Sequence, residues 1–319
     1  MLYLKRVLTF LIFCGGLIGL LIGASILLMP KNNMSEFGME EVSANGIQGE
    51  KENTIDVLVV GDSEAYSSIS PMQIWKDSGY TSYVCGSGAQ TLDYSLTLLK
   101  RAFQKQSPKL VILETDAIYR EVSDSTADLS RLGDAFSVFR YHNRWKSLSL
   151  NDLKMNPEYT WTEDNKGYIY TDTIDGCQDN GHMTPTESSA KIPDRNVEYV
   201  KEFKNYCEAH GATLLLLSTP STVNWNYERH NGIVSLASEL SCDYIDMNLM
   251  SDEISIDWQK DTKDQGDHLN YYGAQKVTSY LTDYLSQTGL FTDHREDSTY
   301  EKWNEALSRY ESTVSAADA

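Results

Sequence analysis

Two short segments of this sequence contain the residue types that nucleophilic catalysis needs. The first is Gly61-Asp62-Ser63-Glu64, which directly follows an apolar run at positions 57–60. A serine in a turn after a buried strand can expose its hydroxyl next to backbone N–H groups that stabilise an oxyanion. The alternative is that Ser63 only caps the helix that follows.

The second segment spans residues 261–273 and contains His268 together with Asp264 and Asp267. A histidine at this place could take the serine proton, with a carboxylate fixing its tautomer. The alternatives are an acidic surface loop or a calcium loop, although the acids lack the alternating spacing of an EF-hand. Of the six histidines, only His268 combines neighbouring acids with a loop that leads into a predicted helix.

The elements that must position these segments are predicted from hydrophobic patterning. Short apolar runs predict strands at residues 55–60, 81–84, 110–113, 214–217 and 244–245. Helical patterns between them cover residues 92–105, 193–210, 226–240 and 274–287. Continuous apolar strands that alternate with helices predict a three-layer α/β/α sandwich with a mostly parallel five-stranded sheet. Binding sites in such folds form beyond the carboxyl ends of the strands.

The order of these motifs resembles that of the SGNH/GDSL hydrolase family, over about residues 54–288. Gly61-Asp62-Ser63 resembles the block that carries the nucleophile, and residues 86–90 resemble the second block. The resemblance implies a flavodoxin-like fold and a serine hydrolase that needs no cofactor. It also implies an oxyanion hole that includes the backbone N–H groups of Ser63 and Gly88.

The third block departs from the family pattern. Glu114-Thr115-Asp116 stands where the family has Gly-x-Asn-Asp, so Asp116 replaces an asparagine whose amide would donate to the oxyanion. An ionised carboxylate cannot donate a hydrogen bond. Thr115 or a backbone N–H group could substitute for it.

The last block, Asp267-His268-Leu-Asn, departs in its spacing. The family acid normally precedes the histidine by three residues, and that position holds Gln265. Asp264 lies four residues before His268 and Asp267 lies one before. Gly266 allows a bulge that would bring Asp264 into place, which slightly favours Asp264 over Asp267.

The N-terminus predicts a membrane anchor over residues 1–29. Residues 7–29 carry no charge and are long enough to cross a bilayer, and Lys5 and Arg6 would remain in the cytoplasm. A cleaved signal peptide is the alternative. We expect a single-pass protein of the cell membrane, with a flexible linker at residues 30–53 and an extracellular C-terminal domain.

Composition excludes several functions. The chain has 27 basic and 46 acidic side chains, a formal net charge of −19, which argues against binding to nucleic acid and to anionic head groups. Four of the five cysteines lie outside the anchor, so they permit two disulfides in three pairings or are simply buried thiols. No cluster has the ligand spacing of a metal site such as zinc.

Residues 120–192 interrupt the strand–helix pattern and are rich in aromatic side chains. We interpret them as an insertion that forms a lid or substrate wall, with Tyr141 and Trp145 stacking on sugar rings. The alternative is that the aromatic residues form a miniature core. Residues 289–319 form a polar tail in which Tyr300, Trp303, Leu307 and Tyr310 have the spacing of an amphipathic helix. We expect this helix to dock on the domain, and docking on a partner is the alternative.

Together these features predict an extracytoplasmic serine esterase or O-acyltransferase that forms an acyl-Ser63 intermediate. An anchored domain of this kind resembles accessory proteins of membrane-bound O-acyltransferases, which implies an acylated glycan or envelope polymer as substrate and such an acyltransferase as partner. The main alternative is an inactive scaffold that keeps the fold. A phosphate- or nucleotide-binding domain is less favoured, because the chain lacks both GxGxxG and GxxxxGK.

Overall fold

The computed structural model describes residues 2–317 and divides into two compact units. The sheet unit comprises Ser43–Val122 and Thr162–Ala319. The small unit comprises Met1–Val42 and Ser123–Trp161. Each unit therefore contains segments from two distant parts of the chain.

The sheet unit is built on five parallel strands. They are β1 (Val57–Gly61), β2 (Ser82–Gly86), β3 (Leu110–Glu114), β4 (Thr213–Ser218) and β5 (Asp243–Asp246), in the order β2-β1-β3-β4-β5. Every residue of β1, β2 and β3 is buried, as expected for strands covered on both faces. The predicted five-stranded parallel sheet is confirmed.

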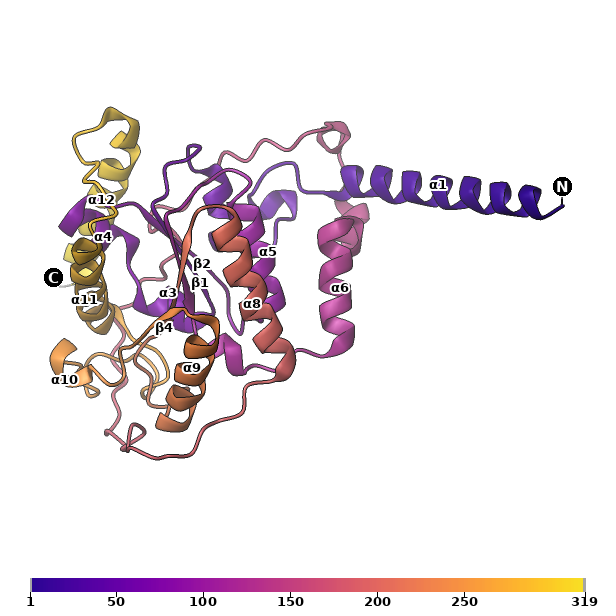
Figure 1. Cartoon of the computed structure of the whole chain (residues 1–319). Coiled ribbons are helices and arrows are strands. Elements are labelled where there is room, and N and C mark those ends of the chain that lie inside the picture. The colour runs from indigo at the N-terminus through magenta and orange to yellow at the C-terminus, as the bar shows by residue number, and fades with distance from the viewer. Residues whose placement is uncertain (1, 318–319) are drawn as a thin grey trace. The chain divides into compact units, whose positions relative to one another are not determined.

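Helices cover both faces of this sheet. They are α3 (Ser63–Ser68), α4 (Pro71–Ser78), α5 (Leu92–Ala102), α8 (Asp194–Ala209), α9 (Tyr227–Leu240), α10 (Ser251–Ile254) and α11 (Tyr271–Thr288). Figure 1 shows α5 and α8 on one side of the strands, with α4 and α11 on the other. The three-layer prediction is therefore confirmed.

Local side chains set where the helices near the carboxyl edge begin. The Asn226 side chain accepts a hydrogen bond from the Arg229 N–H and starts α9. Asn270 likewise accepts from the N–H groups of Tyr272 and Gly273. Because of this cap, α11 begins three residues before the predicted start.

The C-terminal tail docks on the sheet unit, as the apolar spacing predicts. It contains η6 (Ser298–Tyr300) and α12 (Glu301–Ala317), and α12 packs against α4. Trp303 is buried, with its ring centroid 5.4 Å from that of Trp75. The tail is therefore an integral part of this unit.

The prediction of a flexible linker at residues 30–53 is wrong. The segment contains η1 (Ser35–Phe37), α2 (Val42–Asn45) and η2 (Gly46–Gly49), and Ile47 and Gln48 are buried. The Gln48 side chain donates a hydrogen bond of 2.6 Å to the Arg101 carbonyl. Polar residues without periodicity are thus ordered by partners far away in the sequence, which local patterning does not reveal.

The small unit joins the N-terminal helix to part of the predicted insertion. It contains α1 (Leu2–Leu28), α6 (Asp124–Ala135), α7 (Val138–Tyr141), η4 (His142–Ser147) and η5 (Leu150–Leu153). In α1, Tyr3–Leu28 is long and apolar enough to cross a membrane. The single insertion predicted at residues 120–192 is therefore wrong, because residues 123–161 and 162–192 belong to different units.

Arg144 holds the end of α1 in place. Its guanidinium donates to the Leu28 carbonyl at 2.6 Å and to the Asp152 carboxylate, also at 2.6 Å. Burial alone would raise the pKa of Asp152, but hydrogen bonds from Ser149 and Arg144 lower it below its usual value. The side chains of Arg144 and Asp152 are both at least nine-tenths buried.

The disulfides that the cysteine count permits do not form. All five cysteines are free thiols, and all lie within residues 2–317. Burial raises the pKa of the Cys85 and Cys207 thiols. These two side chains thus match the alternative interpretation of buried thiols.

Replacing Arg144 should destabilise the small unit. We expect Arg144→Ala to cost about 3–5 kcal/mol, because it leaves the Asp152 carboxylate buried without its partner. Limited proteolysis of the full chain should then cleave within residues 123–161 much faster than in the native protein. Arg131→Ala is the matched control, since Arg131 is exposed on α6, and equal cleavage of both variants would contradict this assignment.

Candidate active site

Asp264 and His268 form a hydrogen-bonded pair beyond the carboxyl edge of the sheet. The Asp264 Oδ2 atom lies 2.7 Å from His268 Nδ1, and its Oδ1 accepts the His268 backbone N–H at 2.6 Å. Asp267 Oδ2 is 3.7 Å from the same ring nitrogen. The structure therefore places Asp264, not Asp267, in the position that orients the ring.

The four-residue spacing works because the chain makes a tight bulge between the two residues. Gln265 and Gly266 both have positive φ, 58° and 90°. A Cβ atom on Gly266 would lie 2.1 Å from Thr222 Oγ1 and 2.7 Å from Cys177 Sγ, so a larger residue would force these side chains to shift, and the positive φ also favours glycine. The Thr222 N–H also donates to the Gly266 carbonyl at 2.8 Å, which ties the bulge to the loop after β4.

Ser63 is the first residue of α3, and only Asp62 separates it from the end of β1. Asp62 caps this helix by accepting the Glu64 N–H at 3.1 Å. Ser63 is half-buried, whereas Glu64 is fully buried. The strand-to-helix turn thus leaves the serine accessible at the carboxyl edge, as the motif predicts.

The histidine loop reaches this N-terminal turn of α3. Glu64, Asp267 and His268 each offer an oxygen or nitrogen atom within 4.8 Å of the others. The Lys263 ammonium donates to Ser67 Oγ at 2.9 Å, a second contact between this loop and α3. The two predicted segments therefore meet at one edge of the sheet.

His268 has one ring nitrogen that remains available for proton transfer. Its Nε2 is buried and, within residues 2–317, has no hydrogen-bond partner, so no hydrogen bond joins it to Ser63 in this structure. When Nδ1 donates its proton to Asp264, Nε2 carries the free lone pair that a general base needs. Such catalytic contacts commonly tighten only when substrate binds.

Below the turn lies a cluster of carboxylates that sequence reasoning did not identify as a cluster. Asp62 and Asp116 share the Arg120 guanidinium, at 2.8 and 3.1 Å. Asp116 also accepts from Arg229 at 2.6 Å. Glu114, at the end of β3, accepts the Asp116 N–H at 2.9 Å. The cluster fastens the turn after β1 to the turn after β3.

Burial raises the pKa of three acids at this edge, Asp62, Glu64 and Glu114. Burial and, next, the nearby charge of Asp116 raise the pKa of Asp62 to about 6, despite the opposing hydrogen bonds from Glu64 and Arg120. Burial followed by the charge of Glu114 raises the pKa of Glu64 well above its usual value. Burial followed by the charge of Asp62 does the same for Glu114.

The prediction that Asp116 belongs to an oxyanion hole is wrong for its side chain. Both carboxylate oxygens accept hydrogen bonds from arginines, so the group offers no donor. Thr115, one substitute considered, is fully buried and pairs with Ser218 at 2.5 Å. The proposed backbone donor at Gly88 lies in an exposed loop after β2; its role stays a prediction.

Asn224 is a further polar residue that the sequence analysis missed. Its amide donates to Glu64 Oε1 at 2.8 Å and to Asp267 Oδ1 at 2.5 Å. It therefore links α3 to the histidine loop. Its position a few residues after the β4 strand, at the predicted binding edge, was the signal available in the sequence.

Glu64, Asp267 and His268 are also the residues that could hold a metal ion, by the closeness of their ligand atoms. In these residues Glu64 Oε2 and His268 Nε2 have no hydrogen-bond partner within residues 2–317. A histidine nitrogen and two carboxylates would suit a divalent transition metal. A metal bound at His268 Nε2 would make that nitrogen unavailable as a base.

The predicted stacking role of Tyr141 is wrong, because Tyr141 is buried in the small unit. It packs with Leu28 and Met39, and its hydroxyl donates to the Met39 sulfur at 3.6 Å. This matches the alternative of a miniature core. Trp145 is 65% exposed in the same unit, and its contact with substrate stays a prediction.

Comparisons with known proteins find similarity only among solved structures. The chain matches no family model and no curated protein. Similar structures include a GDSL-like lipase from Bacteroides thetaiotaomicron VPI-5482 (12% identity, 73% of this chain and 88% of that chain, TM-score 0.38). Others are a lipase/acylhydrolase from Enterococcus faecalis (10%, 73% and 96%, 0.40) and the psychrotrophic esterase EstA from Pseudoalteromonas sp. (11%, 73% and 97%, 0.38).

The raised pKa values predict how stability depends on pH. Because burial raises the pKa of Asp62, Glu64 and Glu114 in the folded protein above the values of the unfolded chain, the free energy of unfolding should fall as pH rises from about 4. The part due to Asp62 should be complete a little above its folded pKa of about 6, and the part due to Glu64 and Glu114 should continue to higher pH. The Asp62 shift alone corresponds to on the order of 3 kcal/mol. Urea denaturation of the full chain in detergent at several pH values measures this slope.

Glu64→Gln should flatten that slope and raise stability at pH 8, since glutamine keeps the acceptor for Asn224 without a charge. Glu121→Gln, at an exposed position, is the control and should leave the slope as it is. A slope that is unchanged in Glu64→Gln would show that Glu64 does not hold a proton in the folded protein.

Proposed function

We propose that this chain is a serine esterase or O-acyltransferase of the SGNH/GDSL type. The observation that carries the proposal is the Asp264–His268 hydrogen bond, with Nε2 free, beside the helix that begins at Ser63. Nucleophile, base and orienting acid then come from the two segments whose residue types suit this chemistry. The substrate is an ester on an acylated glycan or other cell-envelope polymer, outside the cell.

In the proposed mechanism Ser63 Oγ attacks the ester carbonyl carbon and transfers its proton to His268 Nε2. Asp264 holds the Nδ1 proton and stabilises the imidazolium. The backbone N–H groups of Ser63 and Gly88 stabilise the oxyanion. His268 then protonates the departing alcohol, which leaves an acyl group on Ser63. Water or a sugar hydroxyl completes hydrolysis or transfer, and a membrane-bound O-acyltransferase is the proposed partner.

An inactive scaffold remains the second candidate, and two observations favour it. Asp116 replaces the family amide with a carboxylate paired to two arginines, and no hydrogen bond joins Ser63 to His268 within residues 2–317. Either feature would slow an acylation step. The next experiment separates the two candidates.

Fluorophosphonate labelling tests for the reactive serine. We expect the full chain to be labelled on Ser63, because the phosphonate is attacked like an ester, and we expect no labelling of Ser63→Ala. Peptide mass spectrometry locates the adduct, with Ser67→Ala on the same helix as the control. An unlabelled, folded native chain would support the scaffold.

The two aspartates should differ in their kinetic importance. Asp264→Asn should lower kcat/KM for a p-nitrophenyl ester roughly 10³- to 10⁴-fold, because the ring loses the partner that sets its tautomer. Asp267→Asn should lower it less than about 10-fold, since its oxygen is 3.7 Å from the ring nitrogen. The reverse order would assign the orienting role to Asp267.

A further inference from the structure

The exposed apolar side chains outside α1 are concentrated in the small unit. Between residues 145 and 155, five large apolar side chains are exposed, to between 38% and 86%. We call them the 145–155 patch: Trp145, Leu148, Leu150, Leu153 and Met155. Soluble surfaces seldom gather so many large apolar groups, and such patches mark interaction sites.

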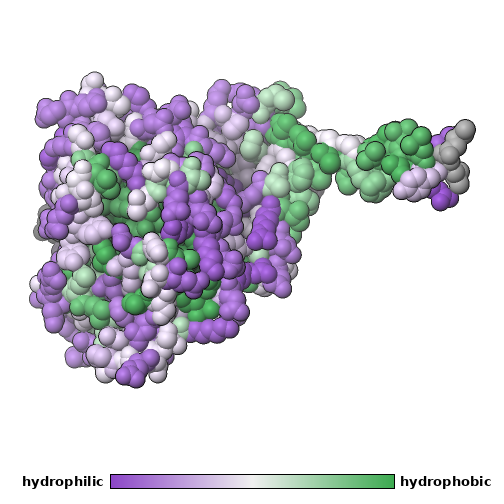
Figure 2. Space-filling view, in the orientation of Figure 1, coloured by the Kyte–Doolittle hydropathy of each residue, from purple (hydrophilic) through white to green (hydrophobic). Residues whose placement is uncertain are grey.

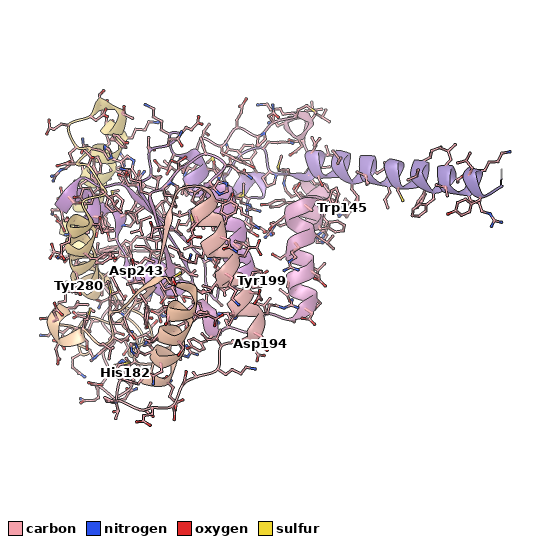
Figure 3. The ribbon with its side chains drawn as sticks, viewed as in Figure 1. Trp145, His182, Asp194, Tyr199, Asp243 and Tyr280 are labelled. Carbon is pink, nitrogen blue, oxygen red and sulfur yellow. The ribbon has the colours of Figure 1, made fainter. Side chains whose placement is uncertain are left out.

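This patch is continuous with the C-terminal end of α1. Both η4 and η5, which carry most of the patch, contact α1. Arg144, next to Trp145, donates to the carbonyl of Leu28, the last residue of α1. Figure 3 shows Trp145 beside this end of the helix. In Figure 2 the green of α1 continues into green residues around the same end.

The net charge of the chain is unevenly divided between the two units. The small unit has eight basic and eight acidic side chains, so it is formally neutral, and the sheet unit carries the whole net charge of −19. A neutral unit can approach a lipid surface without the repulsion that the sheet unit would meet at anionic head groups. The unit that holds the candidate membrane helix is thus the one suited to a bilayer.

The side chains that flank the patch suit the boundary between lipid and water. Lys146 lies with its ammonium 5.8 Å from the Trp145 ring centroid, and Lys154 lies between Leu153 and Met155 in the chain. Tryptophan is enriched at membrane interfaces, and lysine can bury its stem while its ammonium reaches water. An amphipathic surface of this composition can lie in the interfacial plane of a bilayer.

We propose that the 145–155 patch inserts into the lipid leaflet that surrounds the C-terminal end of α1. The patch contacts the bilayer itself: acyl chains cover Leu150, Leu153 and Met155, and Trp145 lies at head-group depth. The small unit then forms a second membrane contact beside the spanning helix. This contact fixes the depth of the unit, and the proposal does not depend on Ser63 chemistry.

Quenching of tryptophan fluorescence tests this contact. The full chain is reconstituted into phosphatidylcholine vesicles with brominated or ordinary acyl chains, because bromine quenches only tryptophans at the membrane. We expect the brominated vesicles to quench part of the emission. We expect Trp145→Phe to lose at least half of this quenched fraction and Trp258→Phe, a nearly buried position in the sheet unit, to retain it.

A second variant tests insertion without changing a fluorophore. Leu150→Asp/Leu153→Asp alters two exposed side chains and should reduce the quenching of Trp145 at least twofold, with an unchanged circular dichroism spectrum. Equal quenching of native chain and Trp145→Phe would overturn the proposal. Absence of quenching in lipid vesicles would also overturn the proposal. If Trp145 were then shielded only in native membranes, the patch would be assigned to a protein partner.

Discussion

The hydrogen bond between Asp264 and His268 is the interaction on which the candidate site depends. It forms only because the chain turns sharply through Gln265 and Gly266, in a space closed by Thr222. The same turn anchors the histidine loop to the loop after β4. A backbone constraint at one glycine therefore determines which carboxylate the imidazole faces and leaves Nε2 free.

The buried acids next to the site constrain it through charge rather than through backbone geometry. Asp62, Glu64 and Glu114 are buried close together, where ionised carboxylates are unfavourable, and Arg120, which pairs with Asp62, offsets only part of this cost. This arrangement joins the ends of β1 and β3. The raised pKa values imply that ionising these buried groups lowers stability at neutral pH.

Much of the fold could be predicted because its signals are local. The apolar runs of β1 and β3, and the caps and glycines around the helices, are visible within a few residues of sequence. The preference for Asp264 over Asp267 also followed from one local feature, Gly266. In contrast, the packing of Gln48 on Arg101 and of Arg144 on Leu28 joins residues far apart in the chain. Sequence periodicity does not indicate such pairs. A linker was therefore predicted at residues 30–53, where the chain is in fact packed.

In the candidate site, too, local signals could be read from the sequence and long-range contacts could not. Ser63, Asp264 and His268 were identified from residue type and position at strand ends, whereas Glu64 and Asn224 became visible only when the loops were placed in space. The resemblance to a family explains neither Glu64 nor the carboxylate at Asp116.

A double-mutant cycle on Ser63 and His268 tests the central claim most directly. If the two side chains act as one unit, then Ser63→Ala, His268→Ala and the double variant should all reduce kcat/KM for an ester by the same factor. If the losses instead multiply in the double variant, or if neither substitution changes the rate, the two residues do not form a catalytic pair and the account is contradicted.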